Sequence, residues 1–207
     1  MVIRYPNGQT RTDQQLNKHK ILEESKKSNF ANRGMRFEEA INVSNEYYLN
    51  RNIAVVHKKP TPVQIVAVDY PRRSAAVIRE AYFKEASTTD YNGVYKGLYL
   101  DFEAKETKNK TSFPLKNFHQ HQITHMKNCI KQDGICFVLL WFSSLQRCFF
   151  FPSHLLISIW ETNQRQSIPL TTIAQEGIEL TMGIAPRIPY IQAIDLYIQT
   201  KENHYGK

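Results

Sequence analysis

Three residues near the middle of the chain combine two acids and a base in a pattern that suits metal-assisted chemistry. Asp90 precedes Glu103 by 13 residues, and Lys105 follows two positions later. Alternating apolar and polar residues over 98–105 predict a strand, from which Asp101, Glu103 and Lys105 project to one face. Two carboxylates can hold a hard divalent cation through oxygen, and an ammonium beside them supplies positive charge for an attacking water or a developing negative charge.

The stretch over residues 88–107 is predicted to be a hairpin. Asn92-Gly93 and Lys96-Gly97 both offer turn chemistry. Pairing of the two halves would bring Asp90 alongside Glu103. The same pattern also describes a plain hairpin with a solvated charged face, and the residues alone leave both interpretations open.

The composition indicates one globular domain, and the net charge indicates a polyanionic partner. The 207 residues are 42% hydrophobic and 12% aromatic, enough for a sizeable core. A formal charge of +8 favours a polyanionic partner, nucleic acid before membrane. Residues 33–207 are predicted to form the single domain. Residues 1–32 are basic and poor in apolar residues, and we expect a flexible arm that contacts DNA or only adds solubility.

The cysteine pattern and the apolar runs bear on location. Three cysteines without C-x-x-C spacing favour a reducing compartment and buried thiols over disulfides or a zinc knuckle. The first residues hold no apolar run of secretory length, and residues 134–142 are too short to cross a bilayer. We therefore expect a soluble cytoplasmic protein without a membrane partner.

The region over residues 57–86 is predicted to extend from the body of the protein. A helix over 37–49 and a strand over 53–56 come before it. Residues 63–70 alternate as a strand, and 75–85 return as a short helix or a strand. The extension is either a phosphate-contacting element or an ordinary charged loop, and its basic residues are Lys58, Lys59, Arg72, Arg73, Arg79 and Lys84.

A predicted helix over 115–132 places one polar residue on its apolar face. Gln122 shares the inner stripe with Phe118 and Met126. A buried amide needs partners, so Gln122 either makes a structural hydrogen bond or contacts a bound cation. His121 and His125 do not make a zinc-protease motif, because Gln122 stands where H-E-x-x-H requires glutamate.

The remaining chain is predicted to complete an α/β domain. A continuous apolar strand over 135–142 is followed by a hairpin partner over 147–151. Helices are expected from Pro152 to about Trp160, within 167–177 with a cap around Thr171 and Thr172, and over 189–198.

Several stretches together resemble the RecU-type Holliday junction resolvases of the PD-(D/E)xK nuclease superfamily. The most specific is His57-Lys-Lys-Pro-Thr-Pro-Val-Gln-Ile-Val66, which has no generic physical role that would recur by chance. The matching residues are 4–8, 32–35, 57–66, 69–74, 87–95, 101–111 and 113–115. The segment after about residue 143 and the arm over 10–30 follow the family pattern less closely.

The resemblance implies a mixed central sheet flanked by helices, a restriction-endonuclease-like core with a projecting stalk over 57–86. It implies metal ligation by Thr88, Asp90, Glu103 and Gln122, and stabilisation of the transition state by Lys105. Asp101, a third carboxylate on the reactive face, is expected to support the ligands. The cofactor implied is Mg2+, for which Mn2+ can substitute. The residues predicted to contact DNA are Arg33, Lys58, Lys59, Arg72, Arg73, Lys108 and Lys110.

The predicted function is Mg2+-dependent symmetric nicking of four-way DNA junctions in recombination and DNA repair. The resemblance also implies a homodimer and modulation of the RecA recombinase. Two alternatives stay open at this point. One is a nuclease of the same fold acting on other DNA, and the other is a non-catalytic DNA-binding regulator of a recombinase.

Overall fold

The computed structural model describes residues 37–69, 76–84, 88–162 and 164–205. The chain divides into two compact units, residues 1–39 and 40–207, and the description below concerns the second. The predicted arm over 1–32 lies outside the described residues. No helix among the described residues is long and apolar enough to cross a membrane.

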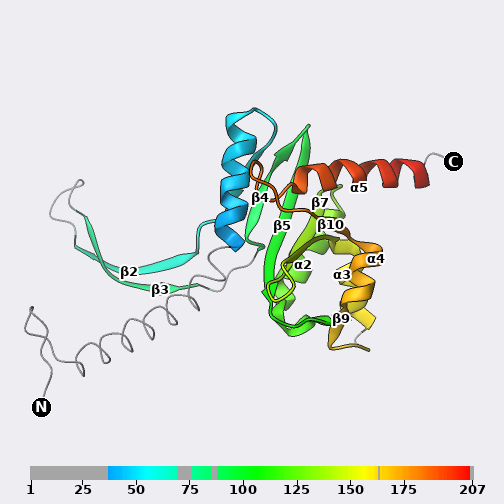
Figure 1. Ribbon diagram of the computed structural model, residues 1–207. Coiled ribbons are helices and arrows are strands. Elements are labelled where there is room, and N and C mark those ends of the chain that lie inside the picture. Colours follow the sequence, from blue (N-terminus) through cyan, green and yellow to red (C-terminus); the bar gives the residue numbers. More distant parts are fainter. Residues whose placement is uncertain (1–36, 70–75, 85–87, 163, 206–207) are drawn as a thin grey trace, which may run out of the picture. The chain divides into compact units, whose positions relative to one another are not determined.

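A six-stranded mixed sheet is the centre of the fold (Figure 1). Its strand order is β1-β4-β5-β7-β8-β10, and only β5 and β7 pair in parallel within it. The bounds are β1 Val55–Lys58, β4 Tyr91–Tyr95, β5 Leu98–Thr107, β7 Ile135–Phe142, β8 Arg147–Pro152 and β10 Ile178–Leu180. The predicted α/β architecture with a mixed central sheet is confirmed.

Helices α2 Gln120–Ile130, α3 Ser153–Thr162 and α4 Leu170–Glu176 pack on one face of this sheet. Because a parallel pair needs a long connection, the chain crosses from β5 to β7 through α2. Ile123 and Met126 of α2 pack into a core with Val138 and Leu140 of β7. This core covers the face of β5 that carries Asp101, Glu103 and Lys105, since Val138 is the strand partner of Glu103.

Aromatic rings fill the opposite face of the sheet. Tyr91, Phe102, Phe137 and Phe150 stack in a row across four neighbouring strands, with centroids 4.8, 4.6 and 4.5 Å apart. Tyr190, at the start of α5 Tyr190–Tyr205, packs against Phe102 and Phe137. The row therefore binds strands β4, β5, β7 and β8 into one rigid layer.

The helix over residues 37–50 is joined to the segment before α5 by hydrogen bonds. The Ser44 hydroxyl accepts from the Ile188 amide at 2.8 Å, and the Tyr48 hydroxyl donates to the Ile188 carbonyl at 3.1 Å. The Tyr190 hydroxyl donates to the Asn45 side chain at 2.5 Å. These bonds satisfy polar groups buried beside the aromatic row.

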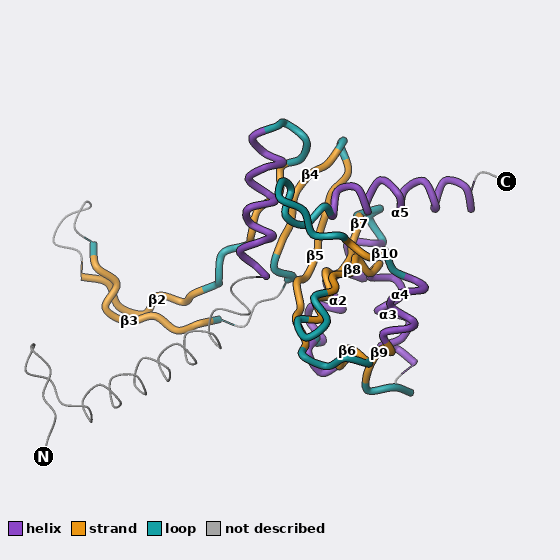
Figure 2. Tube along the Cα trace, in the orientation of Figure 1, coloured by secondary structure: helices purple, strands orange, loops and turns teal. Residues whose placement is uncertain are grey.

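Strands β2 Val63–Asp69 and β3 Val77–Phe83 form a separate two-stranded hairpin (Figure 2). Of the two alternatives for residues 75–85, the strand is therefore correct over Val77–Phe83. The side chains are exposed or half-buried along both strands, and Phe83 is 84% exposed. At its base, the Lys84 amide donates to the Pro62 carbonyl at 3.0 Å. Arg79, one of the predicted basic residues, forms an ion pair with Asp69.

Several element boundaries differ from those predicted. The first strand is Val55–Lys58 rather than 53–56. The helix predicted over 115–132 is a 3-10 turn, Leu115–Asn117, followed by extended residues and then α2, which begins only at Gln120. The predicted cap at Thr171 and Thr172 is wrong. Long-range pairing with β6 Ser112–Pro114 holds β9 Ser167–Pro169 extended, so α4 begins only after Pro169, and it has no side-chain cap.

The β4–β5 turn is formed at Lys96 and Gly97, both with positive φ of 48° and 78°. Asn92-Gly93, the other turn candidate, lies within β4 and is paired on both sides. Gly93 is required there for a different reason. A Cβ at this position would collide with the Val55 carbonyl and stand 2.7 Å from the Val56 Cα.

Substitution of Gly93 by alanine should therefore destabilise the protein by several kcal/mol, because β1 must separate from β4 to admit the methyl group. Gly97→Ala is the matched control, since nothing lies within 4 Å of its added Cβ. It should cost only the left-handed backbone penalty, about 1–2 kcal/mol. Urea denaturation of both variants measures the difference. Equal losses would contradict the close approach of β1 to Gly93.

Candidate active site

The β4–β5 register brings Asp90 and Glu103 together. Tyr91 pairs with Phe102, so the next position in each direction is Asp90 facing Glu103. The Asp90 amide donates to Glu103 Oε2 at 3.1 Å, and the Ala104 amide donates to Asp90 Oδ2 at 3.4 Å. Each acid is therefore held by the backbone beside the other, as the predicted hairpin pairing requires.

Glu103 is the most enclosed of the predicted site residues. Its side chain is 0% exposed. Gln122 Nε2 donates to its Oε1 at 2.7 Å, and Lys105 Nζ lies 2.8 Å from the same oxygen. Strand β5 supplies Lys105 two residues away on the same face, whereas Gln122 arrives from α2 on the layer above. The structure thus assembles four of the five predicted catalytic or metal-binding side chains, Asp90, Glu103, Lys105 and Gln122, in one cluster.

The electrostatics of this cluster fit a divalent cation. The pKa of Glu103 is raised to about 8, chiefly by burial and next by the nearby Asp90 carboxylate, while Lys105 opposes the rise. Two carboxylates this close are costly when both are ionised in a site removed from water. A hard cation that both carboxylates could bind would remove that cost, and oxygen ligands suit Mg2+.

The hydrogen bonds of Gln122 explain why this polar side chain lies on the apolar face of α2. Its Oε1 accepts from the His119 amide at 3.0 Å, and the Gln122 backbone amide donates to the His119 side chain, which completes a capping box. Its Nε2 donates to Glu103. The structural hydrogen bond, one of the two interpretations from the sequence, is observed. A role as cation ligand stays a prediction, and it would fall to Oε1, the acceptor atom of the amide.

Thr88, the other predicted ligand, is not joined to these acids by the contacts described. Its hydroxyl donates to the Thr89 carbonyl at 3.4 Å. The neighbouring Thr89 is buried and bonds instead to Asp101. Ligation by Thr88 therefore stays a prediction.

Asp101 is the centre of a second cluster that sequence reasoning underestimated. It is 0% exposed, and its Oδ2 lies 2.8 Å from Lys59 Nζ, 2.8 Å from the Tyr99 hydroxyl and 3.1 Å from His125 Nε2. The Thr89 hydroxyl donates to Oδ1. Periodicity had marked Asp101 as equal to Glu103, but only the tertiary structure reveals the partners.

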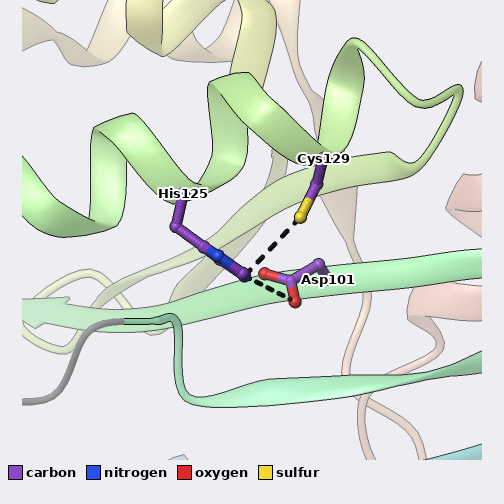
Figure 3. Close-up of side chains that lie close together, drawn as sticks. All are labelled: Asp101, His125 and Cys129. Atoms are coloured by element: carbon purple, nitrogen blue, oxygen red, sulfur yellow. Dashed lines mark hydrogen bonds and ion pairs between the residues drawn. The ribbon is translucent and has the colours of Figure 1, made fainter.

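Asp101, His125 and Cys129 offer ligand atoms within 4.8 Å of one another (Figure 3). Their donor types could hold a divalent cation, and the i, i+4 spacing of His125 and Cys129 on α2 was the available signal. Two features oppose this use. Lys59 already neutralises Asp101. The pKa of the Cys129 thiol is raised, mainly by burial and next by the Asp101 charge, and the raised pKa keeps the thiol protonated.

The thiols and the remaining histidines are disposed largely as expected. All three cysteines are free, with Cys136 and Cys148 buried and Cys129 half-buried. The His119 ring stacks on His121, with centroids 5.5 Å apart, whereas His125 turns towards Asp101. His121 and His125 therefore do not converge on a shared ligand.

The residues predicted to contact DNA fall into three groups. Lys58, Lys108 and Lys110 are exposed. Lys59 is half-buried and paired with Asp101. Arg33, Arg72 and Arg73 lie outside the described residues. DNA contact by any of the seven stays a prediction.

An acid pair and a lysine on a central strand of a mixed sheet are typical of the PD-(D/E)xK nucleases. The model of the family described as Recombination protein U, RecU, matches residues 32–196. The chain belongs to the RecU family, which confirms the resemblance drawn from its residues.

Two relatives at about 60% identity agree with this assignment. A protein named Holliday junction resolvase RecU from Lactiplantibacillus plantarum is 60% identical over 198 residues, covering 94% of this chain and 95% of that protein. One of the same name from Lactobacillus helveticus is 59% identical over 174 residues, covering 84% and 83%. Among solved structures, Archaeoglobus fulgidus Hjc, a Holliday junction resolvase, aligns with a TM-score of 0.41 and 13% identity over 70% of this chain and 94% of its own.

The raised pKa of Glu103 predicts that the cation-free protein loses stability as pH rises. Between about pH 4.5, the ordinary pKa, and about pH 8, the folded state keeps a proton that the unfolded state has released. The free energy of unfolding therefore falls through this window, by at most about 1.4 kcal/mol per pH unit. Urea denaturation in EDTA across the window measures the slope.

Glu103→Gln is the control for this prediction, because an amide cannot titrate and still bonds to Gln122 and Lys105 through its oxygen. Its slope over the same window should be smaller than that of the unchanged protein. The same slope in both proteins would contradict the assignment to Glu103.

Proposed function

We propose that this protein is a structure-specific endonuclease that resolves Holliday junctions by symmetric nicking, in cytoplasmic recombination and DNA repair. The observation that carries the proposal is the buried Glu103, held between Gln122 and Lys105 and facing Asp90, in a chain of the RecU family. A carboxylate pair that is electrostatically unfavourable alone and lies beside an ammonium is suited to hydrolysis of a phosphodiester.

In the proposed mechanism, Asp90 and Glu103 would hold Mg2+, with Mn2+ as a substitute, and Thr88 and Gln122 would complete the ligand set. The bound cation would polarise the scissile phosphate and acidify a water molecule. Lys105 neutralises negative charge that develops on the phosphate, or orients the attacking water. Its 21% exposure leaves the ammonium within reach of a substrate while Glu103 fixes its position.

The symmetry of the substrate supports a homodimer. A four-way junction is resolved by cutting two strands related by an approximate two-fold axis, so two copies of the site related by the same symmetry are the natural arrangement. Modulation of RecA belongs to the same proposal, on the basis of family membership.

The exposed β2–β3 hairpin supports recognition of junction shape. It presents apolar side chains to solvent along both strands, among them Val63, Ile65, Ile78 and Phe83. These apolar groups stay about half exposed or more although the two strands pair with each other. Contact with unstacked bases at the open centre of a junction would cover them, and backbone contacts would account for weak base preference.

Asp90→Ala and Glu103→Ala should each reduce nicking of a synthetic mobile junction in Mg2+ by at least about a hundredfold, a loss of roughly 3 kcal/mol in transition-state stabilisation. Junction binding should change little, because the acids do not attract DNA. Glu179→Gln is the control, since Glu179 is an exposed acid paired with Arg147 on β10 and β8. Nicking that survived either alanine substitution would sink the site assignment.

Replacement of residues 63–83 by a two-residue Asn-Gly turn should weaken junction binding more than duplex binding. The design keeps the Pro62 and Lys84 backbone, which already closes the base of the hairpin, and it spares the six-stranded sheet. Gel-shift titrations with a junction and a duplex of equal length compare the losses. Equal losses on both substrates would reduce the hairpin to a general electrostatic element.

The same junction and duplex substrates, assayed for cleavage in Mg2+ and in EDTA, separate the rival functions. A nuclease specialised for linear DNA would cut duplex as well as junction in direct competition. A non-catalytic regulator of a recombinase would leave the junction uncut in Mg2+ and in EDTA alike.

A further inference from the structure

We propose that Lys59 is a positioning residue that holds the acid pair of the active site, and not a contact to DNA phosphate. The inference rests on the proposed nuclease function and concerns a residue that composition alone assigned to DNA. Three hydrogen bonds of its side chain and backbone carry it.

The Lys59 ammonium is occupied inside the protein. It lies 2.8 Å from Asp101 Oδ2 and donates to the Thr89 hydroxyl at 3.0 Å, and its side chain is only 18% exposed. Asp101 is 0% exposed, so withdrawing the ammonium to meet a phosphate would leave a buried charge without its compensating cation. That exchange is strongly unfavourable. The neighbouring Lys58 is exposed and suits a phosphate contact better.

Lys59 forms hydrogen bonds with the segment that carries Asp90. Its backbone amide donates to the Asp90 carbonyl at 2.7 Å, which continues the β1–β4 pairing by one residue. Its ammonium holds Thr89, the residue immediately before Asp90. The backbone that presents the Asp90 carboxylate is therefore fixed at two adjacent positions by one residue.

Lys59 also forms an ion pair with the strand that carries Glu103. Asp101 lies two residues before Glu103 on the same face of β5, so pinning the Asp101 carboxylate limits rotation and sliding of this face. His125 reaches the same Asp101 oxygen from α2, one turn after Gln122. Asp101 is thus a common fastening point for three parts of the site. These are the residues leading into β4, strand β5 and helix α2, which carry Asp90, Glu103 and Gln122.

The position of Lys59 in the chain gives the fastening a second consequence. It is followed by Pro60-Thr61-Pro62, which leads directly into β2. Proline fixes φ and stiffens this short connection. The root of the exposed hairpin is thereby tied to the backbone of Asp90 through few rotatable bonds.

The test compares Lys59→Met with Lys58→Met in full-length protein, measuring junction affinity at several salt concentrations and single-turnover nicking in saturating Mg2+. Lys59→Met should lower the nicking rate about 10- to 100-fold, as expected when reacting groups are displaced by about 1 Å. Its affinity should stay within about twofold and keep the salt dependence of the unchanged protein. Loss of one phosphate contact would instead reduce the slope of log affinity against log salt by about 0.9. That reduction in Lys59→Met would overturn the inference.

A second variant separates positioning from simple loss of stability. Lys59→Met leaves Asp101 uncompensated and should lower the melting temperature. Lys59→Met combined with Asp101→Asn removes both charges, so it should regain melting temperature while nicking stays low. Recovery of nicking together with the melting temperature would show a purely structural pair and overturn the proposal.

Failure of the proposed function gives a different result. In that case the unchanged protein does not nick junctions in Mg2+, whatever stands at position 59, and the positioning role falls with it. Nicking by the unchanged protein combined with a normal rate for Lys59→Met overturns only the role of Lys59.

Discussion

Two carboxylates buried side by side on one face of β5 are the constraint on which the rest of this structure depends. Asp101 and Glu103 are both 0% exposed, although burial of an ionised acid is among the most unfavourable events in folding. Each has a compensating lysine, Lys59 for Asp101 and Lys105 for Glu103. The difference between them is that Glu103 also faces a second acid, Asp90, and is left with a raised pKa.

That difference divides the work between the two clusters. Asp101 is satisfied on both oxygens by protein donors, so it gains nothing from a cation and serves as a fastening point. Glu103, whose pKa is raised by burial and by the nearby Asp90 carboxylate, would gain from a bound divalent ion. The Glu103–Asp90 site is unfavourable without a cation, whereas the Asp101 site is satisfied by protein groups alone. The Asp101 site can therefore hold the geometry of the Glu103–Asp90 site.

The fold supplies the rigidity that such a site needs. On the far face of β5, the row of stacked rings from Tyr91 to Phe150 and the covering Tyr190 hold four strands together. On the near face, Ile123 and Met126 of α2 are packed in the core, which sets Gln122 at bonding distance from Glu103. The acids are therefore presented by elements whose positions are set by packing and not by flexible loops.

The sequence by itself was sufficient to select the candidate reactive residues and to predict most of the elements. Alternation over 98–105 was sufficient to place Asp101, Glu103 and Lys105 on one face, because side-chain direction in a strand follows from local geometry. Helical periodicity was sufficient to mark Gln122 as a polar residue on an apolar stripe. Boundaries were less secure where distant pairing overrode local preference, as at Ser167–Pro169 and at the start of α2.

Only the tertiary structure decided which of these groups meet and which of them are buried. Lys58 and Lys59 are identical in type and adjacent in sequence, yet one is exposed and the other is committed to Asp101, 42 residues away. Gly93, which reads as a turn residue, is instead the point of closest approach between β1 and β4. Local patterns specify direction and propensity, whereas the partner of a buried charge depends on strand register and on the helix packed above it, and those are properties of the whole folded chain.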